Sequence, residues 1–221
     1  LILFSGMDVL GAVLEGTLGT MMLPLARPSG PHLEWWMQFH YQFSSNTTLL
    51  YWVFNQTITA WLVTLLFLQD KSPRNYVFYG IACLFCAPFA AVGLAVLMVV
   101  KAVAYSIGRI REPLPVLREV FSPQNLLSLA FLLLPVAAYL SANAVGGETA
   151  SVGGQEDIAF FSSEYLLNGK FLLFILLEVG AYLLLIAADH YKNPLYYTLW
   201  AIFLIFPYFH IGRSLDFPMR A

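Results

Sequence analysis

The stretch HLEWWMQFHYQFSSNTTLLYWVFNQTITAWLVTLL, residues 32–66, places a polar cluster directly before an apolar segment. It opens with Glu34 beside two tryptophans, and polar residues such as Asn46 and Asn55 continue into the apolar part. In a bilayer, each polar group left without a partner costs several kcal/mol. The crowding of such groups at one end of an apolar helix therefore predicts a hydrated, protein-lined cavity at one membrane face.

The composition of the whole chain agrees with a membrane setting. Of 221 residues, 59% are hydrophobic and 11% are charged, whereas soluble domains contain about 25% charged residues. The mean hydropathy is +0.72. The formal net charge of −2 is too small to indicate nucleic acid as a partner. We therefore predict an all-α polytopic integral membrane protein.

Apolar segments long enough to cross or enter a bilayer predict about seven transmembrane helices in a single domain over residues 1–221. The segments are residues 1–14, 49–68, 76–105 (two helices), 125–140, 171–188 and 194–208. We expect residues 14–45 to form an outer interfacial loop and residues 141–169 an outer polar loop. Residues 107–124 are expected to form a cytoplasmic connector.

Basic residues decide how residues 76–105 are divided. Lys71 and Arg74 precede this segment, and Arg109 and Arg118 follow it. The positive-inside rule places both groups in the cytoplasm, which requires an even number of crossings between them. We therefore predict a short helix pair that turns near Pro88 on the outer side.

Several side chains are candidates for chemistry at the outer face. A carboxylate there can act as a general base toward a hydroxyl, an arginine can bind phosphate with its bidentate fork, and tryptophan faces can contact a sugar or a lipid head group. The catalytic candidates are Asp8 and Glu34, and the substrate-binding candidates are Trp35, Trp36, Asn46, Asn55, His210, Arg213, Asp216 and Arg220. No metal ligands are predicted.

Each candidate also has a purely structural interpretation. The two tryptophans are typical interfacial anchors, Asp8 is suited to cap a helix, and Asp216 with Arg220 has the spacing of an i,i+4 pair. Glu178 lies in the middle of an apolar segment, where an acid either bonds a neighbouring helix or serves a function. The Cys83-Leu-Phe-Cys86 spacing favours packing within one helical turn over redox or metal chemistry.

Five sequence features resemble bacterial polytopic membrane proteins of envelope polysaccharide pathways, whose arrangement is that of GT-C class glycosyltransferases. The features are FSGMD, HLEWW, QFSSNTTLLYWV, the helix pair around CAPF, and SLDFPMRA. The class uses polyprenyl-phosphate-linked sugars, so the resemblance implies transfer of a sugar to an envelope glycan or lipid acceptor on the extracytoplasmic face. It implies a catalytic acid at Asp8 or Glu34, and lipid-phosphate contacts at Arg220 or Arg213.

Two other classes stay open at this stage. One is a non-catalytic helical subunit of a larger membrane complex, in which polar groups join helices; the other is a lipid or polysaccharide transporter. The expected partners are membrane lipid, a polyprenyl-phosphate sugar and, as an alternative, other membrane subunits, in a bacterial inner membrane. No cofactor is predicted, and a divalent metal stays open as an alternative. Because the chain begins inside an apolar run, we expect a piece of a longer protein.

Overall fold

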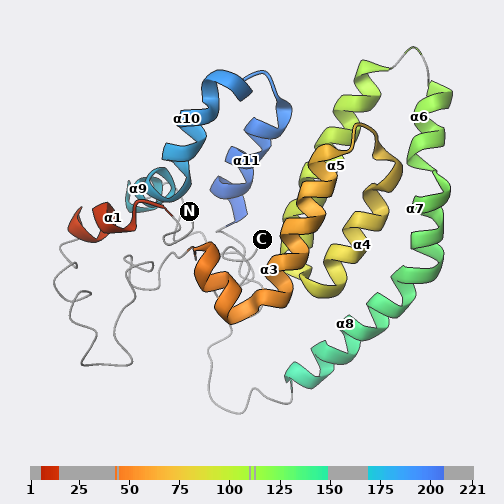
Figure 1. The fold of residues 1–221 in the computed structure, drawn as a ribbon, viewed down its shortest axis with the longest axis horizontal. Coiled ribbons are helices and arrows are strands. Elements are labelled where there is room, and N and C mark those ends of the chain that lie inside the picture. Colours follow the sequence, from red (N-terminus) through yellow and green to blue (C-terminus); the bar gives the residue numbers. More distant parts are fainter. Residues whose placement is uncertain are drawn as a thin grey trace. The chain divides into compact units, whose positions relative to one another are not determined.

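The computed structural model describes residues 6–14, 43, 45–109, 111, 113–148 and 169–206. All regular elements in these ranges are helical, and no strand occurs among them. The chain divides into two compact units (Figure 1). Unit 1 comprises residues 1–54 and 159–220, and unit 2 comprises residues 55–158 with residue 221. Each unit is described by itself.

Three helical runs among the described residues are long and apolar enough to cross a membrane. They are Pro88–Gly108, Leu114–Ala142 and Phe171–His190, with 21, 29 and 20 residues. Val53–Gln69 and Pro194–Ile205 are shorter apolar helices. The protein is therefore an all-helical integral membrane protein, and the predicted number of seven transmembrane helices stays a prediction.

Unit 2 is built around a pair of antiparallel helices. Helix α4 (Tyr76–Cys86) and helix α5 (Pro88–Gly108) are separated by Ala87, whose backbone is not helical (φ −138°, ψ 71°). A proline disfavours the helical conformation in the residue before it, so Pro88 ends α4 and begins α5. The predicted pair around Pro88 is confirmed, but α5 is not short: at 21 residues it is long enough to span a bilayer.

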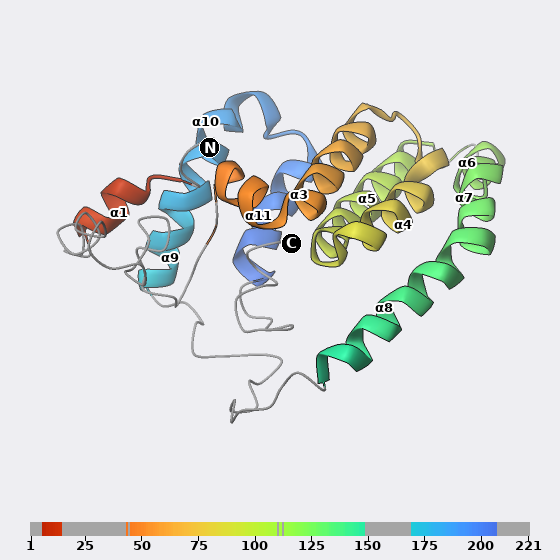
Figure 2. The same ribbon diagram turned by 60° about the horizontal axis from the view of Figure 1, so that its bottom comes forward.

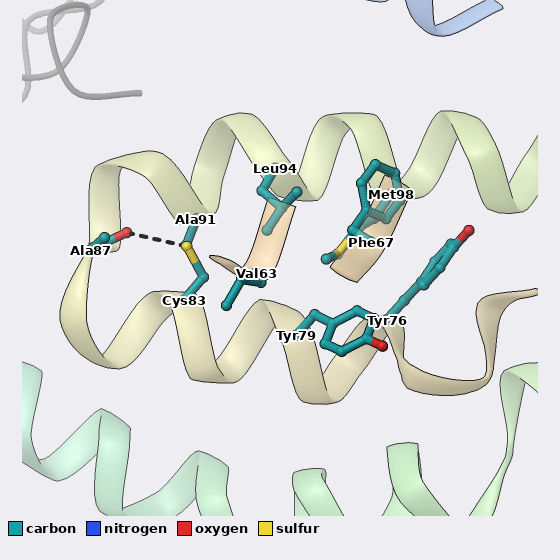
Figure 3. Packing of buried hydrophobic residues seen from close by; sticks show 9 residues of the cluster. All are labelled: Val63, Phe67, Tyr76, Tyr79, Cys83, Ala87, Ala91, Leu94 and Met98. Atoms are coloured by element: carbon teal, nitrogen blue, oxygen red, sulfur yellow. Dashed lines mark hydrogen bonds between the residues drawn. The ribbon is translucent and has the colours of Figure 1, made fainter. Parts of the chain in front are cut away.

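The core of unit 2 joins this pair to the end of helix α3 (Asn46–Gln69) (Figure 3). Apolar residues recur every three or four positions on α4 and α5, which places them on one stripe of each helix. The buried residues are Val63, Phe67, Tyr76, Tyr79, Cys83, Ala87, Ala91, Leu94 and Met98. Cys83 belongs to this stripe, and its Sγ lies 3.9 Å from the carbonyl oxygen of Ala87, which agrees with a packing role.

Helix α3 differs from the straight span expected over residues 49–68. Its backbone breaks at Val53 (φ −141°, ψ 42°), so the continuous apolar helix begins there and ends at Gln69. Residues 46–69 contain no proline or glycine. The sequence therefore carried none of the usual signals of a kink.

The rest of unit 2 is a chain of helices that follows α5. It consists of α6 (Pro113–Val120), α7 (Pro123–Leu127), a π-helical turn (Ser128–Leu132) and α8 (Leu133–Glu148). The expected connector at 107–124 thus contains a whole helix, and α8 continues into the range that was expected to form the polar loop at 141–169. Proline suits the first helical position, where its missing N–H costs nothing, so Pro113 and Pro123 each begin a helix.

Polar side chains tie one end of unit 2 together. Asn125 Nδ2 donates to the carbonyl oxygens of Pro73 (2.9 Å) and Val120 (2.9 Å), and its Oδ1 accepts from Val77 N (3.1 Å). Lys101 Nζ donates to the carbonyl oxygen of Phe67 (2.8 Å) at the end of α3. Residues 67–77 and 101–125 therefore meet at one end of the unit. We call this region the polar end.

The polar end explains the distribution of basic residues in unit 2. Lys71 and Arg74 lie in the connection from α3 to α4, and Arg109 and Arg118 follow α5. Both connections lie at the same end of the unit (Figure 1). The two basic groups therefore lie at the same end of unit 2, while the prediction that they share the cytoplasmic side of the membrane stays a prediction.

Unit 1 packs a short helix and an aromatic cluster on a long helical run. Its elements are α1 (Asp8–Leu14), α9 (Gly169–Ile175), a π-helical turn (Leu176–Gly180), α10 (Ala181–His190) and α11 (Pro194–Ile205). A short turn joins α10 to α11 (Figure 2), and Asn193 caps α11 by accepting from Leu195 N (3.0 Å). The apolar segment over residues 171–188, which was expected to be a transmembrane helix, is confirmed as helical.

Candidate functional site at Asp8 and Glu178

Two acidic side chains are buried in unit 1. Asp8 and Glu178 each expose only 1% of their surface. Removing a carboxylate from water costs several kcal/mol even after the protein relaxes around it. Acids within membrane segments are consequently rare, and they are candidates for function by default. This pair is the starting point for a site.

Asp8 begins a helix. Residues 6 and 7 form a bend, and the first helical hydrogen bond runs from Gly11 N to the carbonyl oxygen of Met7 (3.0 Å). A carboxylate in the first turn is stabilised by the positive end of the helix dipole. We predicted that residues 1–14 form the last part of a spanning helix; the structure describes a helix from Asp8 to Leu14, and residues 1–5 lie outside the described residues, so this stays a prediction.

Glu178 lies in a π-helical turn inside the candidate span Phe171–His190. In this turn Ala181 N donates to the carbonyl oxygen of Leu176, five residues earlier. Single π turns inside α-helices are found frequently at functional sites. Within the same turn, the carbonyl oxygen of Leu177 accepts a hydrogen bond from Met7 N (3.1 Å). The segment before Asp8 is therefore fastened to the turn that carries Glu178.

Gly6 allows this close approach. A Cβ atom at position 6 would lie 2.4 Å from the Cα of Glu178, 2.7 Å from its carbonyl oxygen and 2.7 Å from its Oε2. The first two of these neighbours are backbone atoms, which cannot move aside as the end of a flexible side chain can. Only glycine fits between the bend and the π turn, which gives the Gly6 of FSGMD a physical role.

Apolar side chains enclose the pair. Ala12 of α1 packs with Phe171, Phe174, Ile175 and Leu177. Phe43 stacks on Phe174 with ring centroids 5.5 Å apart, and its other contact is an edge-to-face pair with Phe203 at 5.7 Å. This apolar packing lies directly beside the turn that carries Glu178.

A cavity of about 390 Å³ adjoins Asp8. Its lining among the described residues consists of Gly6, Met7, Asp8, Val9, Leu10 and Val13. Apart from Asp8, these side chains are apolar. The cavity is therefore almost wholly apolar, and the buried Asp8 lies at its wall.

The other predicted site residues are only partly placed. Glu34, Trp35, Trp36, His210, Arg213, Asp216 and Arg220 lie outside the described residues. Asn46 is half-buried at the start of α3 in unit 1, but it is not among the described residues that line the cavity at Asp8. Asn55 belongs to unit 2, is exposed, and accepts from Gln56 N (3.0 Å) through its Oδ1.

Sequence reasoning missed the contact between the bend before Asp8 and the turn that carries Glu178. It named Asp8 and weighed Glu178 separately, without connecting them. The available signal was Gly6 two residues before an acid, but a glycine near an acid has many explanations. The π turn has no sequence signature. Within the described ranges, no group of three or more His, Cys, Asp or Glu side chains is placed to hold a metal ion.

Comparisons with known proteins add no relatives. No protein-family model matches the chain. Neither the curated proteins nor the solved structures contain a significant match. The interpretation of the site thus depends on its own geometry.

Proposed function

We propose that this chain belongs to a membrane glycosyltransferase of the GT-C class. The enzyme would act in a bacterial inner membrane, with about seven transmembrane helices in the complete arrangement. It would move a sugar from a polyprenyl-phosphate donor to an envelope glycan or lipid acceptor on the extracytoplasmic face. The observation that carries the proposal is Asp8: a buried carboxylate at a cavity in an integral membrane protein, next to Met7, whose N–H donates to the carbonyl oxygen of Leu177.

The reaction requires one base and one stabilised leaving group. Asp8 accepts the proton of the acceptor hydroxyl as the hydroxyl oxygen attacks the anomeric carbon of the donor sugar. The bond from that carbon to the phosphate oxygen breaks, and polyprenyl phosphate leaves with the bonding electrons. Glu34 is the alternative base. Trp35 and Trp36 would contact the sugar, and Asn46 would bind substrate.

The phosphate needs cationic partners. Arg220 and Arg213 are proposed for this role because a guanidinium binds phosphate through two parallel hydrogen bonds. Asp216 and His210 would orient these groups. Such contacts keep charge on the phosphate as the sugar leaves it, and stabilising that charge lowers the barrier.

The base is tested by Asp8→Asn in the purified chain reconstituted in vesicles. Undecaprenyl-phosphate glucose, galactose and mannose, each radiolabelled, serve as donors, and transfer to extracted envelope glycolipid is measured. General base catalysis contributes about 10²–10⁴-fold, so we expect a loss of that size. Asp189→Asn is the matched control, because Asp189 is an exposed acid at the end of α10. Equal activity of Asp8→Asn and Asp189→Asn would remove the proposal.

A transporter is the second candidate, and Glu178 is the observation that favours it. A buried acid in an irregular turn of a spanning helix is typical of substrate and proton pathways. In that case Glu178→Gln abolishes pH-driven uptake of undecaprenyl-phosphate sugar into vesicles, while the wild-type protein transfers no sugar. Transfer without uptake favours the enzyme. Absence of both activities favours a non-catalytic subunit.

A further inference from the structure

A second cavity opens at the polar end of unit 2. Among the described residues, it shares no lining residue with the cavity at Asp8, and its lining is basic instead of acidic. Its volume is about 520 Å³, and it is lined by Arg74, Leu114, Pro115, Arg118 and Glu119. Arg74 comes from the 3₁₀ turn Pro73–Asn75, and the other residues come from α6. The cavity thus combines two guanidinium groups from separate elements with apolar side chains.

The two arginines are available to a ligand. Both are exposed, and among the described residues neither takes part in an ion pair. The one acid in the described lining is Glu119, whose Oε2 accepts a hydrogen bond from Tyr105 Oη (2.5 Å). The nearby Arg109 stacks on the Tyr105 ring with 4.7 Å from its Cζ to the centroid. Because two guanidinium groups face one carboxylate, the described lining keeps an excess of positive charge.

The backbone around the cavity is held firmly. Ser122 Oγ donates to the carbonyl oxygen of Arg74, and Asn125 Nδ2 donates to the carbonyl oxygen of Pro73 (2.9 Å). Ser122 and Asn125 are themselves buried. These bonds fix the 3₁₀ turn with Arg74 against the end of α6, so both guanidinium groups are presented from a preformed frame, which lowers the entropy cost of binding.

The apolar part of the cavity distinguishes a lipid from a free anion. Leu114 lines it and is 72% exposed, and Leu117 and Phe121, which follow at helical spacing, are 51% and 60% exposed. An amphipathic helix with such a face lies in the membrane interface, with its apolar residues among the acyl chains. A free phosphate would use the arginines but leave this face without a partner.

We propose that this cavity binds the phosphate of an anionic membrane lipid, with Arg74 and Arg118 on the phosphate and Leu114 against the first part of an acyl chain. Arginine is suited to this role because its planar fork matches two phosphate oxygens. Basic pockets beside transmembrane helices bind acidic head groups in this manner. The proposal is independent of the glycosyltransferase reaction, because it uses none of the residues assigned to that reaction.

The test is native mass spectrometry of the full 221-residue chain in neutral detergent, titrated with dioleoyl phosphatidylglycerol or dioleoyl phosphatidylcholine. We expect tighter binding of phosphatidylglycerol, and a loss of about tenfold or more in Arg118→Gln and in Arg74→Gln, since hydrogen bonds to charged groups are strong. Arg111→Gln is the matched control, because it removes the same charge from an exposed arginine outside the cavity lining. Its affinity should stay within about twofold of wild type, as expected for a surface charge.

Two results overturn the proposal. An equal loss in Arg111→Gln and Arg118→Gln would mean that diffuse charge, not the cavity, attracts the lipid. Displacement of phosphatidylglycerol by an equimolar amount of inorganic phosphate would assign the cavity to a free anion. Arg118→Lys keeps the charge but loses the bidentate fork, so its affinity for phosphatidylglycerol should fall between those of wild type and Arg118→Gln. If Arg118→Gln has a lowered melting temperature, Arg118→Lys replaces it in the test.

Discussion

Replacing Gly6 by alanine tests whether the acidic site is assembled as described. The new Cβ would lie 2.4 Å from the Cα of Glu178 and 2.7 Å from its carbonyl oxygen, so the bend must move away from the π turn. Forcing one extra carbon into a packed interior costs about 1–3 kcal/mol. Loss of the hydrogen bond from Met7 N to Leu177 O (3.1 Å) adds about 0.5–1.5 kcal/mol. We expect Gly6→Ala to lower the free energy of unfolding by about 1.5–4.5 kcal/mol.

The measurement is reversible unfolding in mixed micelles with rising SDS, followed by tryptophan fluorescence. Gly108→Ala is the control, because a Cβ at position 108 meets no atom within 4 Å; there, restricting the unfolded chain should leave stability unchanged or slightly raised. In addition, at temperatures where the Gly6→Ala variant is folded, its sugar-transfer activity should still be lower than that of wild type. The loss of stability alone would not explain this difference. If Gly6→Ala and Gly108→Ala unfold at the same SDS fraction, the close contact between the bend and Glu178 does not exist.

Three further predictions concern the polar end of unit 2. Asn125→Ala removes three hydrogen bonds to backbone groups from a residue that is 2% exposed; it should cost about 3 kcal/mol in the same unfolding assay, and a cost below about 1 kcal/mol would contradict these bonds. Lys101→Met loses the bonds to the last carbonyl oxygens of α3 and should cost about 1–2 kcal/mol, whereas Lys71→Met, at an exposed position, should cost almost nothing. In a cysteine-free background, Lys71→Cys and Arg111→Cys should react with an impermeant maleimide from the same side of the membrane, and labelling from opposite sides would disprove the antiparallel pair.

The helix pair of unit 2 shows what the sequence was able to predict. Pro88 interrupts an apolar run that is too long for one ordinary span, and basic residues precede and follow that run. Proline restricts the backbone of the residue before it, and the positive-inside rule depends on the basic residues of the connecting loops. Both effects depend on the sequence alone, so they could be predicted without a structure. The unequal lengths of α4 and α5 could not be predicted in this way. The limits of each helix depend on its packing against α3 and on the hydrogen bonds of Asn125.

The acidic site shows where the sequence was insufficient. Asp8 and Glu178 are separated by most of the chain, and no local pattern connects them. The segment before Asp8 contacts the turn of Glu178 through one glycine and one backbone bond between residues 7 and 177. The kink at Val53 is similar, since no proline or glycine lies within α3 to announce it. Contacts of this kind are decided by tertiary packing, and only the structure reveals them.

The two π-helical turns among the described residues differ in their cause: a nearby proline explains the first turn but not the second. The turn Ser128–Leu132 lies just before Pro135, which has no N–H to donate and whose ring clashes with the preceding turn of an α-helix. A wider turn there relieves a local conflict. No proline lies in residues 169–193, so the turn Leu176–Gly180 has no such local cause. What it does have is the bond from Met7 to Leu177 and the close contact of Gly6 with Glu178. The second turn is therefore best explained by the docking of the segment that carries Asp8, and this long-range cause is the reason to assign the site to both acids together.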